Sequence, residues 1–142
     1  MEVASAVQQI IVCDDEHDIR DFLHFFLRQH GYEPLLASDM KEVLQFIKTQ
    51  KPKLILLDIR MPEQDGFEVA ETLRRHGNGI PIIFITAHDN MFCRVYSPTV
   101  GAVGYFTKPL DTDALIRRIE QVMNGSIGPS SSALMPSVQY HP

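Results

Sequence analysis

Polar side chains that can do chemistry follow the short apolar runs of this chain. In sequence order they are Asp14, Asp15, Asp58, Thr86 and Lys108. Three carboxylates and one ammonium carry about −2 at neutral pH, so the group repels itself unless a divalent cation is bound. Mg²⁺ fits best, because it is a hard ion that takes oxygen ligands and keeps several waters. No cysteine or histidine accompanies the acids at ligand spacing, which disfavours a soft metal.

A carboxylate beside a divalent cation can also act as a nucleophile towards phosphorus. The cation and a lysine then neutralise the charge on the transferring group. One acid at the centre of the group can play this part, and the Thr86 hydroxyl, on a neighbouring strand, is expected to donate to the new phosphoryl oxygens. An acyl phosphate of about −2 in place of a carboxylate changes both charge and acceptor count, which is the basis of a switch.

Five buried strands must position these side chains. Their apolar runs cover residues 10–13, 33–37, 54–57, 82–85 and 103–106. A helix is expected after each strand, and this alternation predicts an α/β fold with parallel pairing and right-handed crossovers. Ligands of such sheets bind outside the carboxyl ends of the strands, so every polar side chain of interest is expected at one edge.

The helices are predicted from the spacing of apolar residues and from breakers. The first helix ends at Gly31, and its apolar residues are Ile19, Phe22, Leu23, Phe26 and Leu27. Ser38 or Asp39 caps the second helix, and Pro52 ends that strand–helix unit. The third helix starts at Phe67, the fourth starts at His88-Asp89, and the fifth is capped by Asp111. Pro98 should end the fourth helix near Tyr96, because proline cannot continue a helix. Phe25 is expected to be a packing residue.

Length and composition indicate one ordinary globular domain. The chain has 142 residues, of which 44% are hydrophobic and 22% charged. We expect an N-terminal extension at 1–8, the folded domain at 9–123 and a flexible tail or linker at 124–142, where ten of nineteen residues are Gly, Ser or Pro.

Charge and cysteine content exclude several classes. A formal charge of −5 argues against direct binding of nucleic acid by this domain, which needs clustered Lys and Arg. Cys13 and Cys93 lie in different predicted elements without CxxC spacing, so neither a disulfide framework nor a zinc site is indicated. The absence of a signal-peptide pattern and of a long apolar run predicts a cytoplasmic protein without a membrane partner.

The order and spacing of five motifs resemble the receiver domain of bacterial two-component response regulators, of the chemotaxis-regulator type. The motifs are the acid pair Asp14-Asp15, the apolar strand into Asp58, the MPEQDG loop with Pro62 and Gly66, Thr86-Ala87, and GYFTKP ending in Lys108-Pro109. The resemblance covers about residues 9–123. It implies a flavodoxin-like (βα)5 sandwich whose parallel sheet has the order 2-1-3-4-5.

The resemblance also implies roles for single residues. Asp58 would accept a phosphoryl group from a histidine kinase or phosphotransfer protein. The ligands of Mg²⁺ would be Asp14, Asp15, Asp58 and the backbone carbonyl of Arg60. Thr86, Ala87 and Lys108 would contact the phosphoryl group, with a cis bond between Lys108 and Pro109 fixing the loop.

Two further pairs follow from the family pattern. Thr86 and Tyr105 would be the switch pair, although Tyr105 by itself is typical of an ordinary strand aromatic. Arg60 and His88 occupy the positions that tune phosphoryl lifetime; they either crowd the site against water or point to solvent. The Pro98 segment departs from the family, so we carry over no mode of dimerisation.

The favoured function is a signalling switch that is not an enzyme, because it catalyses only its own phosphorylation and dephosphorylation. Three other functions are compared with it. A phosphorylation-independent interaction module could keep the same fold. An aspartyl-phosphate phosphatase of the haloacid-dehalogenase type is less favoured, because Arg60 stands where its second acid is expected. A flavodoxin-like cofactor binder is disfavoured too, since DDEHD would repel a phosphate. The target is either another protein or an output domain joined to this one.

Overall fold

The structure, a computed structural model, describes residues 7–62 and 64–126. Its strands are β1 (Gln9–Cys13), β2 (Glu33–Ala37), β3 (Pro52–Asp58), β4 (Ile82–Thr86) and β5 (Ala102–Thr107). Its helices are α1 (His17–Gln29), α2 (Met40–Thr49), α3 (Gly66–Arg75), α4 (Met91–Tyr96) and α5 (Thr112–Met123), with a 3₁₀ turn, η1 (Ser97–Val100), after α4. The predicted tail from residue 127 onward lies outside the described residues.

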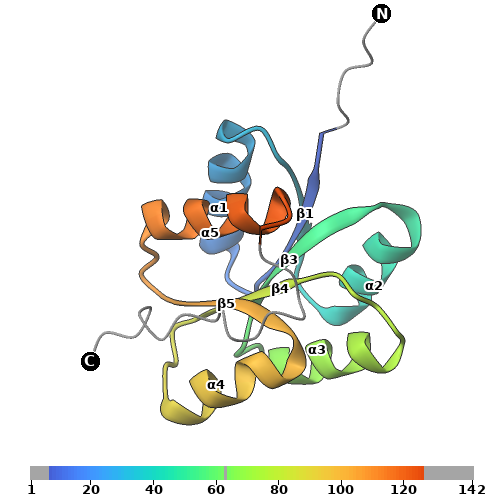
Figure 1. The fold of residues 1–142 in the computed structure, drawn as a ribbon, viewed down its shortest axis with the longest axis vertical. Helices are drawn as coiled ribbons and strands as arrows, with labels where there is room; N and C mark the ends of the chain where they lie inside the picture. Colours follow the sequence, from blue (N-terminus) through green and yellow to red (C-terminus); the bar gives the residue numbers. More distant parts are fainter. Residues whose placement is uncertain (1–6, 63, 127–142) are drawn as a thin grey trace, which may run out of the picture.

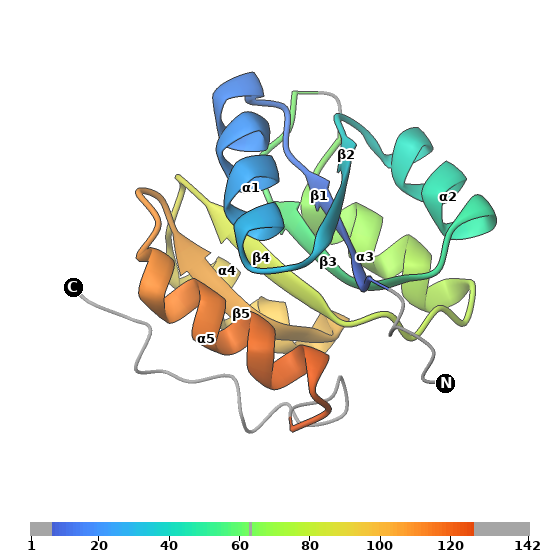
Figure 2. The same cartoon turned by 90° about the horizontal axis from the view of Figure 1, so that it is seen from above.

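The five strands form one parallel sheet in the order β2-β1-β3-β4-β5. Helices α1 and α5 cover one face, and α2, α3 and α4 cover the other (Figures 1 and 2). Each face has its own apolar core, and the strand side chains alternate between the two. The α/β prediction and the sheet order implied by the resemblance are therefore confirmed.

Several helix ends follow the predicted chemistry. Asp39 caps α2 by accepting from the backbone N–H of Glu42, and Asp111 caps α5 by accepting from that of Ala114. Gly31 follows α1 with φ +87°, the left-handed geometry that a glycine takes there.

The predicted boundary at Pro52 agrees with the structure, because α2 ends at Thr49 and Pro52 is the first residue of β3, a position that a proline fits. The predicted start of the fourth helix was wrong. Helix α4 begins at Met91 and not at His88-Asp89, because the Asn90 side chain accepts from the Cys93 N–H and so caps the helix. The α-helix does end at Tyr96, as Pro98 predicted, but the chain continues in the 3₁₀ turn.

The prediction that Phe25 is a packing residue was also wrong. Its side chain is 61% exposed, and Phe22, placed on the apolar stripe of α1, is 41% exposed. The buried residues of α1 are Leu23, Phe26 and Leu27, so the rings of Phe22 and Phe25 lie outside its buried stripe. Among the described residues, no helix has the length and hydropathy needed to cross a membrane.

Candidate functional site

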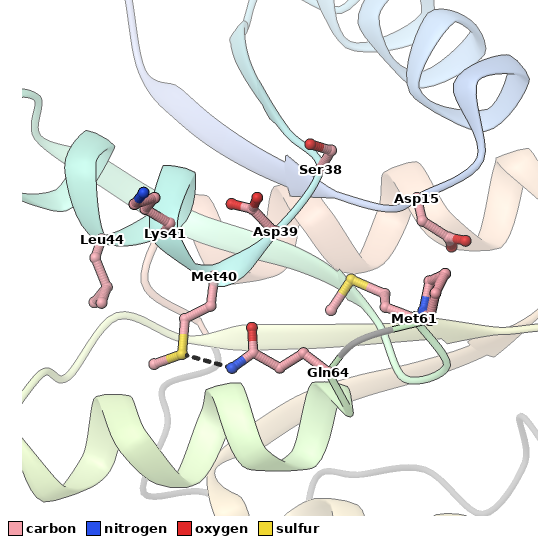
Figure 3. Close-up of a pocket in the computed structure, with 9 residues that line it drawn as sticks. Asp15, Ser38, Asp39, Met40, Lys41, Leu44, Met61 and Gln64 are labelled. Atoms are coloured by element: carbon pink, nitrogen blue, oxygen red, sulfur yellow. Dashed lines mark hydrogen bonds between the residues drawn. The ribbon is translucent and has the colours of Figure 1, made fainter.

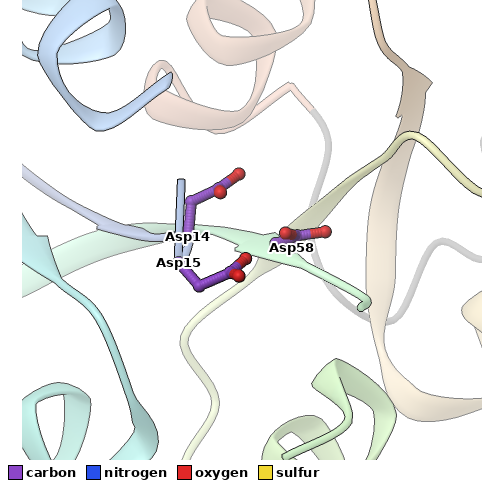
Figure 4. Close-up of side chains that lie close together, drawn as sticks. All are labelled: Asp14, Asp15 and Asp58. Atoms are coloured by element: carbon purple, nitrogen blue, oxygen red, sulfur yellow. The ribbon is translucent and has the colours of Figure 1, made fainter. Parts of the chain in front are cut away.

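Strand register brings the predicted acids together. Cys13 pairs with Leu57, so the next residues, Asp14 and Asp58, lie side by side at the carboxyl edge of the sheet. Asp14 is fully buried and Asp58 is 3% exposed, whereas Asp15 is exposed. The three side chains lie close together and extend to the same side (Figure 4), and one oxygen from each lies within 4.8 Å of the others. A set of three hard oxygen donors fits Mg²⁺.

Lys108 lies at the same carboxyl edge of the sheet, directly after the outermost strand β5. Its ammonium Nζ lies 2.9 Å from Asp14 Oδ2, 2.7 Å from Glu16 Oε1 and 3.6 Å from Asp58 Oδ2. The first two are hydrogen bonds, and the third is an ion-pair contact only. The Lys108 ammonium thus contacts three carboxylates, and its contact with Asp58 is the longest of the three.

The electrostatics follow from this crowding. Burial, and after it the charge of Asp14, raises the pKa of Asp58 to about 7, while Lys108 opposes both effects. Burial also raises the pKa of Asp14, against the lowering effect of its bond from Lys108. Burial disfavours the Lys108 ammonium, but its bonds to Glu16 and Asp14 outweigh that and raise its pKa. The site holds excess negative charge that a divalent cation would neutralise.

The loop after β3 fixes the direction of Asp58. The backbone N–H of Arg60 donates to Asp58 Oδ1 at 3.2 Å, and that of Gly66 donates to Ile59 O at 2.7 Å. Asp65 begins α3 in a capping box with Glu68. The loop therefore returns onto the strand that it leaves, and α3 starts against the backbone of Asp58 and Ile59.

Gly66 makes this close return possible, and we expect Gly66→Ala to destabilise the protein by about 3 kcal/mol. An added Cβ would lie 2.8 Å from Ile59 Cα and would also meet the carbonyl oxygen of Asp58. Urea denaturation measures the loss. Gly79→Ala is the matched control, because a Cβ there has nothing within 4 Å. Equal stability of the two variants would contradict this account of the loop.

Thr86 ends β4, and its hydroxyl accepts from the His88 N–H at 2.9 Å. The Thr86 carbonyl accepts from the Lys108 N–H at 2.8 Å, and the Lys108-Pro109 bond is cis. These contacts join the ends of β4 and β5. The threonine and the lysine are therefore positioned by one another as well as by the sheet.

Tyr105 lies inside the protein, with 2% of its surface exposed. Its hydroxyl donates to Asp89 Oδ1 at 2.9 Å, and the guanidinium of Arg94 lies 5.1 Å from its ring centre while also pairing with Asp89. Burial and the bond to Asp89 raise the pKa of the Tyr105 hydroxyl. The segment after Thr86 and the helix α4 thus meet on this ring.

Two cavities lie at this edge of the sheet. The larger, about 630 Å³, opens between the start of α2 and the β3–α3 loop, where Gln64 Nε2 lies 3.2 Å from Met40 Sδ (Figure 3). It contains Asp15 but neither Asp58 nor Lys108, so we do not assign the chemistry to it. A smaller cavity of about 230 Å³ holds the chemical groups and is lined by Asp15, Glu16, Asp58, Arg60, Ala87, His88 and Lys108.

The structure thus brings together Asp14, Asp15, Asp58 and Lys108, with Ala87, Arg60 and His88 lining the same cavity. Thr86 lies at the end of the adjacent strand. Sequence reasoning missed Glu16 as a partner of Lys108 and missed the contacts of Tyr105 with Asp89 and Arg94. The only signal for Glu16 was its place directly after the acid pair.

Comparisons with known proteins found similar sequences and similar structures. The profile of the response regulator receiver domain matches residues 10–120. The alkaline phosphatase synthesis transcriptional regulatory protein PhoP of Bacillus subtilis is 37% identical over 119 residues, which are 84% of this chain and 50% of that protein. The chain therefore spans about half the length of this curated relative.

Solved structures show the same fold. The receiver domain of the Francisella response regulator 1452 superposes with a TM-score of 0.78 at 28% identity, covering 84% of this chain and 99% of that one. A CheY-like receiver domain protein from Methanospirillum hungatei superposes with a TM-score of 0.77 at 28% identity, covering 84% and 95%.

Proposed function

This chain belongs to the family of response regulator receiver domains, and on that premise we propose that Asp58 accepts a phosphoryl group in two-component signal transduction. The donor is a phosphohistidine of a histidine kinase or phosphotransfer protein. The observation that carries the proposal is a nearly buried Asp58 beside two further carboxylates and within 3.6 Å of the Lys108 ammonium. The protein works as a switch in the cytoplasm.

In the transfer step a carboxylate oxygen of Asp58 attacks phosphorus. The new O–P bond forms as the P–N bond to the donor histidine breaks, and the electron pair leaves with the imidazole nitrogen. Lys108 neutralises charge on the phosphoryl oxygens, and the Thr86 hydroxyl and the Ala87 N–H donate to them. Mg²⁺ held by Asp14, Asp15, Asp58 and the Arg60 carbonyl would supply charge neutralisation and orientation of the phosphoryl group.

The switch is read out through Thr86 and Tyr105. A phosphoryl group on Asp58 offers the Thr86 hydroxyl a stronger acceptor than its present surroundings, and a shift of Thr86 disturbs the β4–α4 segment that holds Asp89. Since Asp89 bonds the Tyr105 hydroxyl, the change reaches α4 and β5. The target is a separate protein or an output domain of the same chain.

The test of the proposal is site mapping. The chain is incubated with a small phosphodonor such as phosphoramidate, with Mg²⁺ or with EDTA, and the acyl phosphate is trapped by borohydride reduction. Mass spectrometry is expected to find one modified residue, Asp58, and only with Mg²⁺. Modification at another residue, or none, would reject the proposal.

Arg60 and His88 are proposed to lengthen the life of the acyl phosphate, because both line its cavity and shield it from water. We expect Arg60→Asn to speed dephosphorylation severalfold, since a short side chain admits water and removes a cation. Loss of trapped phosphate is followed over time after removal of the donor. Arg75→Asn, an exchange on α3 away from the cavity, is the control, and an unchanged lifetime in Arg60→Asn would show that its side chain plays no such part.

A further inference from the structure

Among the described acids that contact Lys108, Glu16 is the one that the sequence analysis did not assign to the site. Its Oε1 is 2.7 Å from Lys108 Nζ, which is shorter than the bond to Asp14 at 2.9 Å and the contact with Asp58 at 3.6 Å. The acids on Lys108 are therefore unequal. The residue outside the proposed metal set forms the shortest bond, and the nucleophile has the longest contact.

The conformation of Glu16 favours this bond. Glu16 stands at the N-cap position of α1, yet its side chain makes no capping bond to the helix. Its backbone N–H donates to Asp14 Oδ1 at 2.8 Å, which fixes the main chain beside the site, and its carboxylate extends to Lys108. Glu16 is 57% exposed at its side chain, so the carboxylate can release the ammonium to water-filled space without being buried unpaired.

We infer that Glu16 is a positioning residue that competes with the phosphoryl group for Lys108. It draws the ammonium towards α1 and away from Asp58, and the ammonium must leave it to contact a phosphoryl group on Asp58. The inference rests on the proposed function and adds a regulator to the same site. As a consequence, Glu16 destabilises the phosphorylated form of the protein relative to the form with a free Asp58 carboxylate.

The physical reason is that the Lys108 ammonium has a fixed number of N–H donors and cannot lie beside Glu16 and beside a phosphoryl group on Asp58 at the same time. A metal ion bound to Asp14 would weaken the bond between Asp14 and Lys108, and Glu16 would then be the remaining competitor of the phosphoryl oxygens. An ion pair with a half-exposed partner contributes modestly, so the competition is worth about two- to fivefold in affinity for a phosphoryl group. Such a factor sets how much of the protein is switched on at a given kinase activity.

The test is a double-mutant cycle on the full chain. Beryllofluoride, a tetrahedral mimic of the phosphoryl group, is titrated calorimetrically with Mg²⁺ into the native chain, Glu16→Gln, Lys108→Ala and the double variant. We expect Glu16→Gln to tighten binding about two- to fivefold when Lys108 is present and to have a clearly smaller effect when it is absent. Asp18→Asn, an exposed acid in the first turn of α1, controls for lost charge.

Equal effects of Glu16→Gln with and without Lys108 would overturn the inference, because Glu16 would then act by its charge alone. A second measurement does not need the lysine variant to fold. In ¹⁵N NMR of the native chain, scalar coupling across the hydrogen bond should join Lys108 Nζ to the Glu16 carboxylate carbon, and in Glu16→Gln the Lys108 ammonium signal should move. Absence of that coupling together with an unmoved signal would overturn the inference as well.

These outcomes separate the inference from the proposed function. If beryllofluoride binds the native chain but not Asp58→Asn, the phosphoryl site is established whatever the cycle shows. If it binds neither, or both equally, the proposed function fails first.

Discussion

Asp58→Asn is expected to abolish magnesium-dependent labelling by a small phosphodonor, a loss of about a hundredfold or more. The amide that replaces the carboxylate is too weak a nucleophile to form an acyl phosphate, and it removes one oxygen donor and one charge from the metal set. The fold should persist, since the side chain keeps its size and Arg60 N–H can still donate to the amide oxygen. Labelling is measured by phosphate incorporation with matched Mg²⁺ and EDTA samples.

Asp113→Asn is the matched control for this result. Asp113 is an exposed acid in the first turn of α5, so the exchange removes the same charge without touching the site. It should label like the native chain. If Asp58→Asn were labelled as strongly as the control, the phosphoacceptor would be another residue.

The fold was largely predictable because its signals are local. Runs such as residues 54–57 are apolar at every position, which is typical of a strand buried on both faces, and each is followed by a helical pattern and a turn. A parallel sheet then places the strand ends at one edge, so Asp14, Asp58 and Lys108 could be grouped from their positions in the sequence alone. The strand order itself required the resemblance to a known family.

The contacts that were missed depend on side-chain reach. Glu16 and Lys108 are 92 positions apart, and only the final position of the lysine, between three acids, shows which of them it favours. Likewise the bond from Tyr105 to Asp89 depends on the turn after Thr86, where α4 begins three residues later than predicted. Neither position is marked by hydrophobic periodicity.

The errors about which aromatic rings are buried also come from tertiary packing. Helical spacing placed Phe22 on the buried stripe, and Phe25 was expected to be a packing residue, but the width of the stripe is set by how closely α1 approaches the sheet. Pro98 was interpreted correctly as the end of the α-helix, because the steric effect of proline is local.

In metal-free solution, Asp58→Asn is expected to be more stable than the native chain at pH 8, by on the order of 2 kcal/mol, and the difference should vanish towards pH 4. Burial and the charge of Asp14 raise the pKa of Asp58 to about 7 in the folded chain, from about 4 in an unfolded one. The folded native chain therefore binds more protons between pH 4 and pH 7. Its free energy of unfolding falls as the pH rises through that window and levels off above it.

Asparagine cannot ionise, so the variant lacks this loss, and urea denaturation in EDTA at several pH values measures the difference. Asp113→Asn should show no such pH-dependent gain. Mg²⁺ should reverse the order at pH 8, because it stabilises the native acid set by mass action and binds the variant less well. Protonation of Asp58 competes with the binding of Mg²⁺, so stabilisation of the native chain by Mg²⁺ should weaken below pH 7. A stability difference that does not change between pH 4 and pH 8 would show that Asp58 is ionised throughout, and that Lys108 neutralises it more fully than a separation of 3.6 Å implies.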